Sequence, residues 1–160
     1  MHCKPHAIVD KIRSTANSRG DVVALRSVVF DCDGVLIDTI SSWRIIHEHF
    51  GTNSGPMLDQ FLKGGISDED FMADDIRHWK SVQSEIHRDE LMRCYQGVSL
   101  NPGARELVDA LKEREINVSI VSAGVDLLIG SIAKMLKVDD WVSNGFQYCE
   151  DGFLQDEGVV

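Results

Sequence analysis

The sequence predicts an α/β fold in which a parallel sheet carries a group of helices inserted after its first strand. Short apolar runs at residues 27–30 and 118–121 have the length and β-branched content of buried parallel strands. Between and after these runs, apolar residues recur every three or four positions, as on one face of a helix. Strands that alternate with helices along a chain are typical of a parallel sheet.

The first predicted strand, residues 27–30, ends at Asp31, and Gly34 then breaks the run. Residues 1–26 precede it and mix charged, polar and small apolar side chains. They are interpreted as an N-terminal extension, in which Ile8, Val9 and Ile12 could form a short helical stripe.

Residues 39–100 have a helical pattern and no convincing strand, which predicts a small helical insert. Apolar stripes predict helices near residues 43–50, 57–62 and 85–95, and Gly51 is expected to end the first of them. Ser67, with Asp70 three residues later, is typical of the capped start of another helix.

After residue 101 helix and strand alternate clearly. Asn101 is expected to cap a helix that has Pro102 at its first position, and Asp126 is expected to cap the helix after strand 118–121. A short strand at 141–142 and a hairpin turn at Asp151-Gly152 follow. This order predicts a Rossmann-like parallel sheet core.

The charge balance of the 160 residues limits the partners, because the formal net charge is −10. An acidic surface repels phosphate backbones and anionic lipid heads, so neither nucleic acid nor a membrane is an expected partner. A small anionic substrate is compatible with this charge where a bound cation reverses the local field. The sequence leaves the oligomeric state open.

The four cysteines are scattered along the chain and form no CxxC pair: Cys3, Cys32, Cys94 and Cys149. This pattern predicts free thiols rather than a zinc site or a disulfide framework. Free thiols are typical of a reducing compartment, which predicts the cytoplasm.

Asp31 and Asp33 are the strongest candidates for chemistry. Two residues apart on a strand, both carboxylates would lie on one side, with Cys32 on the other. Two like charges this close need a cation or a proton between them, and Mg²⁺ suits such oxygen ligands. One carboxylate could attack phosphorus while the other moves protons, and Gly34 would let the backbone approach a ligand.

The alternative interpretation of these aspartates is a solvated acidic turn at a strand end. A calcium-binding EF-hand loop is excluded, because Leu36 and Ser42 stand where that loop needs its glycine and its bidentate glutamate.

The segment from Val28 to Leu36, VVFDCDGVL, resembles the first motif of the haloacid dehalogenase superfamily. The resemblance implies that Asp31 is the nucleophile, that Asp33 is the general acid/base, and that both hold Mg²⁺. Dehalogenase members of the superfamily lack the second Asp, so Asp33 points to phosphate chemistry.

The segment Ser119 to Asp126, SIVSAGVD, resembles the second motif of the same superfamily. By this resemblance Ser122 binds the transferring phosphoryl group, helped by backbone N–H groups near Ala123 and Gly124. A serine in an ordinary strand–helix turn is the alternative interpretation.

The phosphoserine phosphatase-like branch is the nearer likeness, and it covers about residues 28–154. It implies a core formed by residues 27–38 and 101–160, with residues 39–100 as a helical cap. Ile40 stands where that branch carries an acidic residue that meets the substrate, so phosphoserine is not the expected substrate.

The superfamily also carries a late lysine and a late acidic motif, and this sequence matches neither of them. Lys134 and Lys137 come too early and are interpreted as surface residues, and no apolar strand precedes Asp156 and Glu157. The expectation is therefore a chain truncated at its C-terminus, with a core whose C-terminal part is missing.

The predicted function of the intact protein is Mg²⁺-dependent hydrolysis of a small phosphorylated metabolite through an aspartyl-phosphate. This chain alone could be an inactive fragment. The alternative from another class is a non-catalytic remnant that binds phosphorylated metabolites or is completed by a partner chain. Transfer of the phosphoryl group to another acceptor would use the same residues.

Overall fold

The computed structural model describes residues 24–160, so the helical stripe expected at residues 8–12 lies outside the described residues. Four strands form one sheet in the order β1-β2-β3-β4: β1 (Ser27–Phe30), β2 (Asn117–Val125), β3 (Asp140–Tyr148) and β4 (Leu154–Val159). β1, β2 and β3 run parallel, and β4 returns antiparallel to β3. The predicted α/β fold with a parallel sheet is confirmed.

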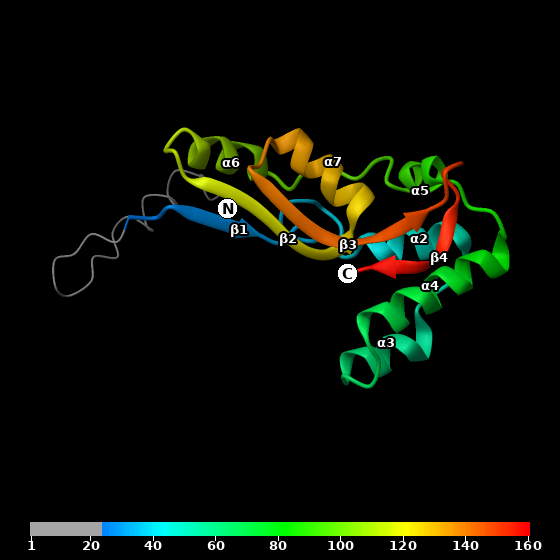
Figure 1. Ribbon diagram of the computed structural model, residues 1–160. Helices are drawn as coiled ribbons and strands as arrows, with labels where there is room; N and C mark the ends of the chain where they lie inside the picture. The colour runs from blue at the N-terminus through cyan, green and yellow to red at the C-terminus, as the bar shows by residue number, and fades with distance from the viewer. Residues whose placement is uncertain (1–23) are drawn as a thin grey trace.

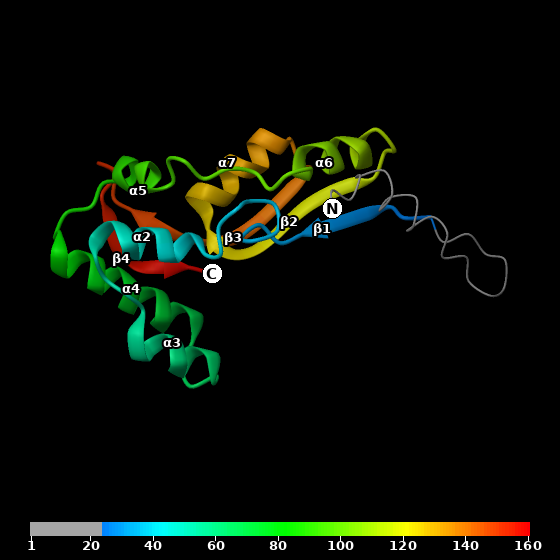
Figure 2. The ribbon, with the colours of Figure 1, turned by 180° about the vertical axis from the view of Figure 1, so that it is seen from behind.

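The described chain also contains six helices: α2 (Ser42–Phe50), α3 (Gly55–Leu62), α4 (Asp68–Val82), α5 (Arg88–Cys94), α6 (Ala104–Lys112) and α7 (Asp126–Leu136). Figure 1 shows α6 and α7 along one face of the sheet, whereas α3 and α4 extend from the opposite side beyond β4. The view from behind shows the same division (Figure 2). None of the described helices is long and apolar enough to cross a membrane.

Alternation along the strands explains why only one face of the sheet is well covered. Val118 and Ile120 point toward α6 and α7 and are fully buried. Val29, Val121 and Val142, on neighbouring strands, point the other way and remain 59%, 53% and 58% exposed. The described part of the chain therefore leaves an apolar strip on the second face.

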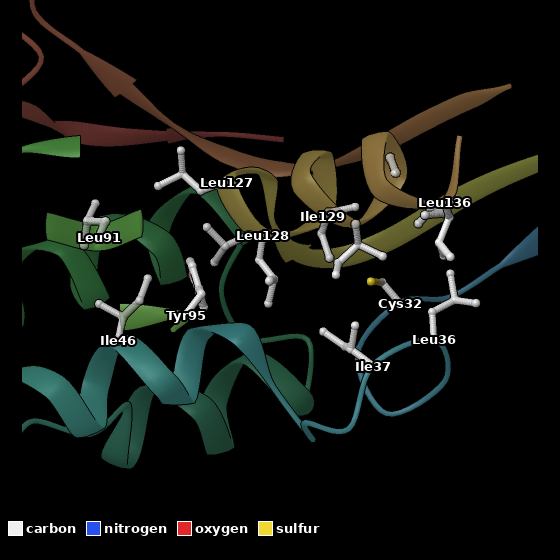
Figure 3. Packing of buried hydrophobic residues seen from close by; sticks show 14 of the residues in the cluster. Cys32, Leu36, Ile37, Ile46, Leu91, Tyr95, Leu127, Leu128, Ile129 and Leu136 are labelled. Carbon is white, nitrogen blue, oxygen red and sulfur yellow. The ribbon is translucent and has the colours of Figure 1, made fainter. Parts of the chain in front are cut away.

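The covered face continues into one core that joins the sheet to the inserted helices. Figure 3 shows Cys32, Leu36 and Ile37 lying under Ile129 of α7, with Ile46 of α2 in the same packed layer. The loop after β1 is thus anchored by its apolar residues, which leaves its polar residues to face outward.

The helix signals read from the 39–100 segment are confirmed. Gly51, with φ +64°, ends α2 in the left-handed conformation that favours glycine. The Ser67 hydroxyl accepts the backbone N–H of Asp70 and so caps α4.

Two expected caps are wrong. Gly103, with φ +88°, is the N-cap of α6, and the Asn101 amide instead donates to three carbonyls of the loop after β1, at Gly34, Val35 and Ile37. Asp126 is the first residue of α7, and the residue in the cap position is Val125. At Asn101 a tertiary contact overrides the local preference for a cap, and at Asp126 the longer strand β2 does so.

Strands β2 and β3 extend further than their apolar runs indicate. β2 continues through Ser122 to Val125, and β3 reaches Tyr148, beyond the expected 141–142. The hairpin at Asp151-Gly152 is confirmed, because Gly152 donates to the Cys149 carbonyl and has φ +84°. α4 packs against β4, so the hairpin ties the inserted helices to the sheet.

Candidate active site

The loop that follows β1 is a tight turn built around the Cys32 carbonyl. That oxygen accepts the backbone N–H groups of Val35, Leu36 and Ile37 at 3.1, 2.9 and 3.2 Å. The turn requires φ +72° at Gly34, a conformation that costs glycine little. Cys32 is fully buried, whereas Asp31 is exposed and Asp33 is partly exposed, as expected for aspartates on the side opposite Cys32.

Asp33 is held by the first turn of α2. Its Oδ2 atom accepts the Ser42 backbone N–H at 2.6 Å and the Ser42 hydroxyl at 2.7 Å. A carboxylate is favoured at a helix N-terminus, where backbone N–H groups point outward. The Oδ1 atom is buried and has no hydrogen-bond partner among the described residues. Asp33 is therefore fixed through one oxygen, and its other oxygen is buried without a partner in the described chain.

Ser122, Ala123 and Gly124 lie where the pairing of β2 with β3 becomes irregular. Ser122 pairs with Ser143 and Val125 with Asn144, so Ala123 and Gly124 form a bulge between two ordinary pairs. The Ser122 hydroxyl oxygen is largely buried and accepts the Gly124 N–H at 3.2 Å.

Asp33 and Gly124 are close neighbours across the two strand ends. A methyl group on Gly124 would lie 3.1 Å from Asp33 Oδ2 and 2.8 Å from Ser42 Oγ. β1 and β2 are adjacent and parallel, so both expected motifs reach the same edge of the sheet. The structure thus brings Asp33 and Gly124 into close proximity, with Asp31 and Ser122 on the same strand ends.

Ser42 joins these parts and was not among the site residues predicted from the sequence. Besides its two bonds to Asp33, its hydroxyl oxygen accepts the Val125 backbone N–H at 2.9 Å, and the residue is fully buried. The only signal in the sequence was a serine at the start of an apolar stripe. Its partner Asp33 is nine residues away, across a turn that the sequence does not specify.

A cavity of about 580 Å³ opens beside this edge of the sheet, between α2, α3 and α4. Trp43 lines the cavity next to the strand ends, and its indole N–H donates to the Ala123 carbonyl at 2.9 Å. Ala123 and Asn144 close the cavity on the sheet side. The cavity therefore adjoins the site of the aspartates and the serine.

The wall of this cavity on α2 rests on a buried polar cluster. The Trp79 indole N–H donates to His47 Nδ1 at 3.1 Å, which assigns the neutral ring's proton to Nε2. His47 Nε2 lies 3.0 Å from Asp75 Oδ1, and Asp75 is fully buried. His47 is itself buried, because its ring completes this cluster.

Burial and charge act strongly on the thiol between the two aspartates. Burial, and then the negative charges of Asp33 and Asp31, raise the pKa of Cys32 to about 12. Burial also raises the pKa of Asp126, at the start of α7, above its ordinary value. Lys134 and Lys137 are exposed on and after α7, as the sequence indicated.

The donor set at the strand ends is compatible with Mg²⁺, which takes oxygen ligands and often only one or two carboxylates besides water and substrate phosphate. Asp31 is accessible, and the unpartnered Oδ1 of Asp33 offers a second carboxylate oxygen. Within residues 24–160 no group of three or more His, Cys, Asp or Glu residues is arranged to hold a metal ion. The two aspartates therefore fit part of a magnesium coordination sphere.

The chain is similar in sequence to a known phosphatase. Over 115 residues the chain is 27% identical to the phosphoserine phosphatase of Archaeoglobus fulgidus, covering 71% of this chain and 32% of that protein. The chain therefore spans about a third of the length of this curated relative.

Solved structures share the fold. A phospho-aspartyl intermediate analogue of phosphoserine phosphatase aligns with a TM-score of 0.67 at 19% identity, covering 86% of this chain and 64% of that one. Phosphoserine phosphatase from T. onnurineus aligns with a TM-score of 0.62 at 25% identity, covering 81% of this chain and 62% of that one.

The family model for haloacid dehalogenase-like hydrolases matches residues 28–159, which include both strand ends described above and every described helix. The chain therefore belongs to the haloacid dehalogenase-like hydrolase family and is similar to phosphoserine phosphatases.

Proposed function

We propose that this chain carries the nucleophile and the acid/base of a Mg²⁺-dependent phosphomonoester hydrolase that acts through an aspartyl-phosphate. The observation that supports this most directly is the pair of hydrogen bonds that Ser42 donates to Asp33. Two donors from Ser42 fix Oδ2 at 2.6 and 2.7 Å, beside Gly124, and leave Oδ1 unpartnered within the described chain. A carboxyl group fixed through one oxygen and free at the other suits proton transfer.

In the first step a carboxylate oxygen of Asp31 bonds to phosphorus while the bond from phosphorus to the leaving oxygen breaks. Asp33 gives the proton on Oδ1 to that leaving oxygen, so the alcohol departs neutral. In the second step a water molecule gives a proton to Asp33 Oδ1 and attacks phosphorus. The bond from Asp31 to phosphorus then breaks, which releases inorganic phosphate and restores both aspartates.

Binding of the phosphoryl group is assigned to the bulged end of β2. The Ser122 hydroxyl oxygen accepts from Gly124, so its hydrogen is free to donate to a phosphoryl oxygen. The Ala123 backbone N–H, with the close approach allowed by Gly124 and Gly34, would complete the cradle. Asp31 would hold Mg²⁺, which would neutralise phosphoryl charge, and Asp33 would join it as a ligand only while Oδ1 carries no proton.

The arrangement around this site suggests roles for the two parts of the chain. Residues 27–38 and 101–160 would form the catalytic core, and residues 39–100 would form a cap that supplies the cavity wall for the leaving group. Cys32, Cys94 and Cys149 are free thiols, which supports a cytoplasmic setting.

The test is hydrolysis of 4-nitrophenyl phosphate by the full 160-residue chain, with and without Mg²⁺, beside Asp31→Asn and Asp33→Asn. Asp31→Asn is expected to lower kcat by roughly three orders of magnitude or more, because the covalent step is lost. Asp33→Asn is expected to lower kcat by about 10²- to 10⁴-fold, the usual contribution of a positioned acid/base.

Asp38→Asn is the matched control, because Asp38 is an exposed carboxylate in the same loop. Turnover that needs no Mg²⁺, or that falls equally in Asp38→Asn and Asp31→Asn, would contradict the assignment. Circular dichroism of each variant separates loss of chemistry from loss of fold.

A non-catalytic role, in which a partner completes the sheet, is the second candidate. One observation favours it: β1 is at the edge of the described sheet, and the apolar strip formed by Val29, Val121 and Val142 is exposed. A folded monomer that binds phosphate tightly without turnover would support this candidate over the first.

A further inference from the structure

We infer that the leaving group of the substrate is an apolar, aromatic alcohol rather than an amino acid; this inference rests on the proposed function and names its substrate class. Ala123, which follows Ser122 in the proposed phosphoryl cradle, also lines the cavity, so a group bonded to a phosphoryl moiety held in that cradle would extend into the cavity. Its volume of about 580 Å³ lies within the range usual for small-molecule sites.

Large apolar side chains from all three surrounding helices line this cavity, beside polar groups such as Arg44 and Asp68: Trp43, Leu58, Phe61, Phe71 and Met72. Phe61 and Phe71 stack face to face, with ring centroids 4.7 Å apart. A charged amino-acid leaving group would exchange its hydration for these surfaces and lose free energy, whereas an aromatic ring would gain it.

Trp43 supplies a fixed wall at the end nearest the phosphoryl site. Its N–H is bonded to Ala123, and its ring lies edge-on to Phe146 at 5.3 Å and stacks on buried Trp79 at 6.1 Å. An aromatic wall that is already ordered binds an aromatic ligand without further loss of rotamer freedom.

The cations near the cavity do not provide a site for a carboxylate. Among the described residues that line the cavity, Arg44 is the only Lys or Arg, and its guanidinium bonds the Glu48 carboxylate at 2.8 Å. Both side chains are more than half exposed, so this pair belongs to the rim. His47, which also lines the cavity, is committed to Trp79 and Asp75.

The experiment compares 2-phenylethyl phosphate with O-phospho-L-serine as substrates of the full chain. Both esters release a primary alcohol, so the comparison reports the pocket rather than the leaving-group chemistry. We expect kcat/KM to be about tenfold or more higher for 2-phenylethyl phosphate, which corresponds to the burial of one ring. A higher kcat/KM for O-phospho-L-serine would overturn the inference.

Binding of 2-phenylethanol, measured by isothermal titration calorimetry, tests the cavity without catalysis. Leu58→Asp places a carboxylate in the cavity wall and is expected to weaken Kd about tenfold. Leu62→Asp is the matched control, because Leu62 lies one turn further along α3, is 74% exposed and does not line the cavity.

The two hypotheses fail differently. Binding that Leu58→Asp weakens and Leu62→Asp preserves, without turnover of either ester, would uphold the apolar site and contradict the proposed function. Mg²⁺-dependent turnover without binding of 2-phenylethanol by the folded chain would uphold the function and overturn the inference. Equal weakening by Leu58→Asp and Leu62→Asp would also overturn it.

Discussion

Replacing Ser42 with alanine tests whether one buried hydroxyl connects the loop after β1, which carries Asp33, to α2 and β2. The substitution removes the 2.7 Å bond to Asp33 Oδ2 and deprives the Val125 N–H of its acceptor. A bond to a charged group contributes about 1.5–3 kcal/mol, and an unsatisfied buried N–H costs about 1–3 kcal/mol. Because the Ser42 N–H still holds Asp33, we expect a loss of about 3 kcal/mol in the free energy of unfolding.

The measurement is urea unfolding followed by circular dichroism, with thermal unfolding as a second readout. In a chain of this length a loss of about 3 kcal/mol lowers Tm by roughly 6–12 °C. Ser41→Ala is the matched control, because the Ser41 hydroxyl accepts one N–H, from Arg44, at 3.4 Å, and losing such a cap costs about 1 kcal/mol. A Ser42→Ala variant no less stable than Ser41→Ala would refute the reasoning.

Three further predictions follow from other contacts. Gly124→Ala should abolish turnover and lower stability, because the methyl group would lie 3.1 Å from Oδ2 of Asp33, the proposed acid/base; full activity in a kinetic assay would contradict the close approach. The Val118 N–H holds the pKa of Asp139 below its ordinary 3.8. Asp139→Asn should therefore be less stable than the unchanged protein by the full amount near pH 7, and this difference should vanish as pH falls through the lowered pKa. A difference between the urea midpoints of the two proteins that does not change with pH would be evidence against this. With its pKa raised to about 12, buried Cys32 should resist alkylation by iodoacetamide at about pH 8 while exposed Cys149 reacts; mass spectrometry showing equal labelling in the folded chain would rule this out.

Local signals predicted the helices that depend on their own termini. Ser67 caps α4 and Gly51 ends α2, because each interaction lies within one turn of the chain. Asn101 was wrongly predicted to be a cap, since its amide binds carbonyls of residues 34–37, more than sixty positions away. No local rule contains a partner at that distance.

The candidate site divides in the same way. Asp31, Asp33 and the Ser122 segment could be singled out as candidates because an apolar strand that ends in polar residues is visible in the sequence. Ser42 was missed because its function depends on the turn that carries the chain back to Asp33. The buried position of His47 could not be predicted, because nothing in the sequence reveals that Trp79 and Asp75 surround it.

The attachment of α2 has a consequence for how the site could open. Its first residue holds Asp33, its second carries the indole bonded to Ala123, and its middle carries His47 of the cavity wall. An outward rotation of α2 that released a product would therefore withdraw the donors from Asp33 in the same movement. Opening of the cavity and loss of the position of Asp33 would be one event, so the Asp33 carboxylate would be correctly placed only while the site is closed.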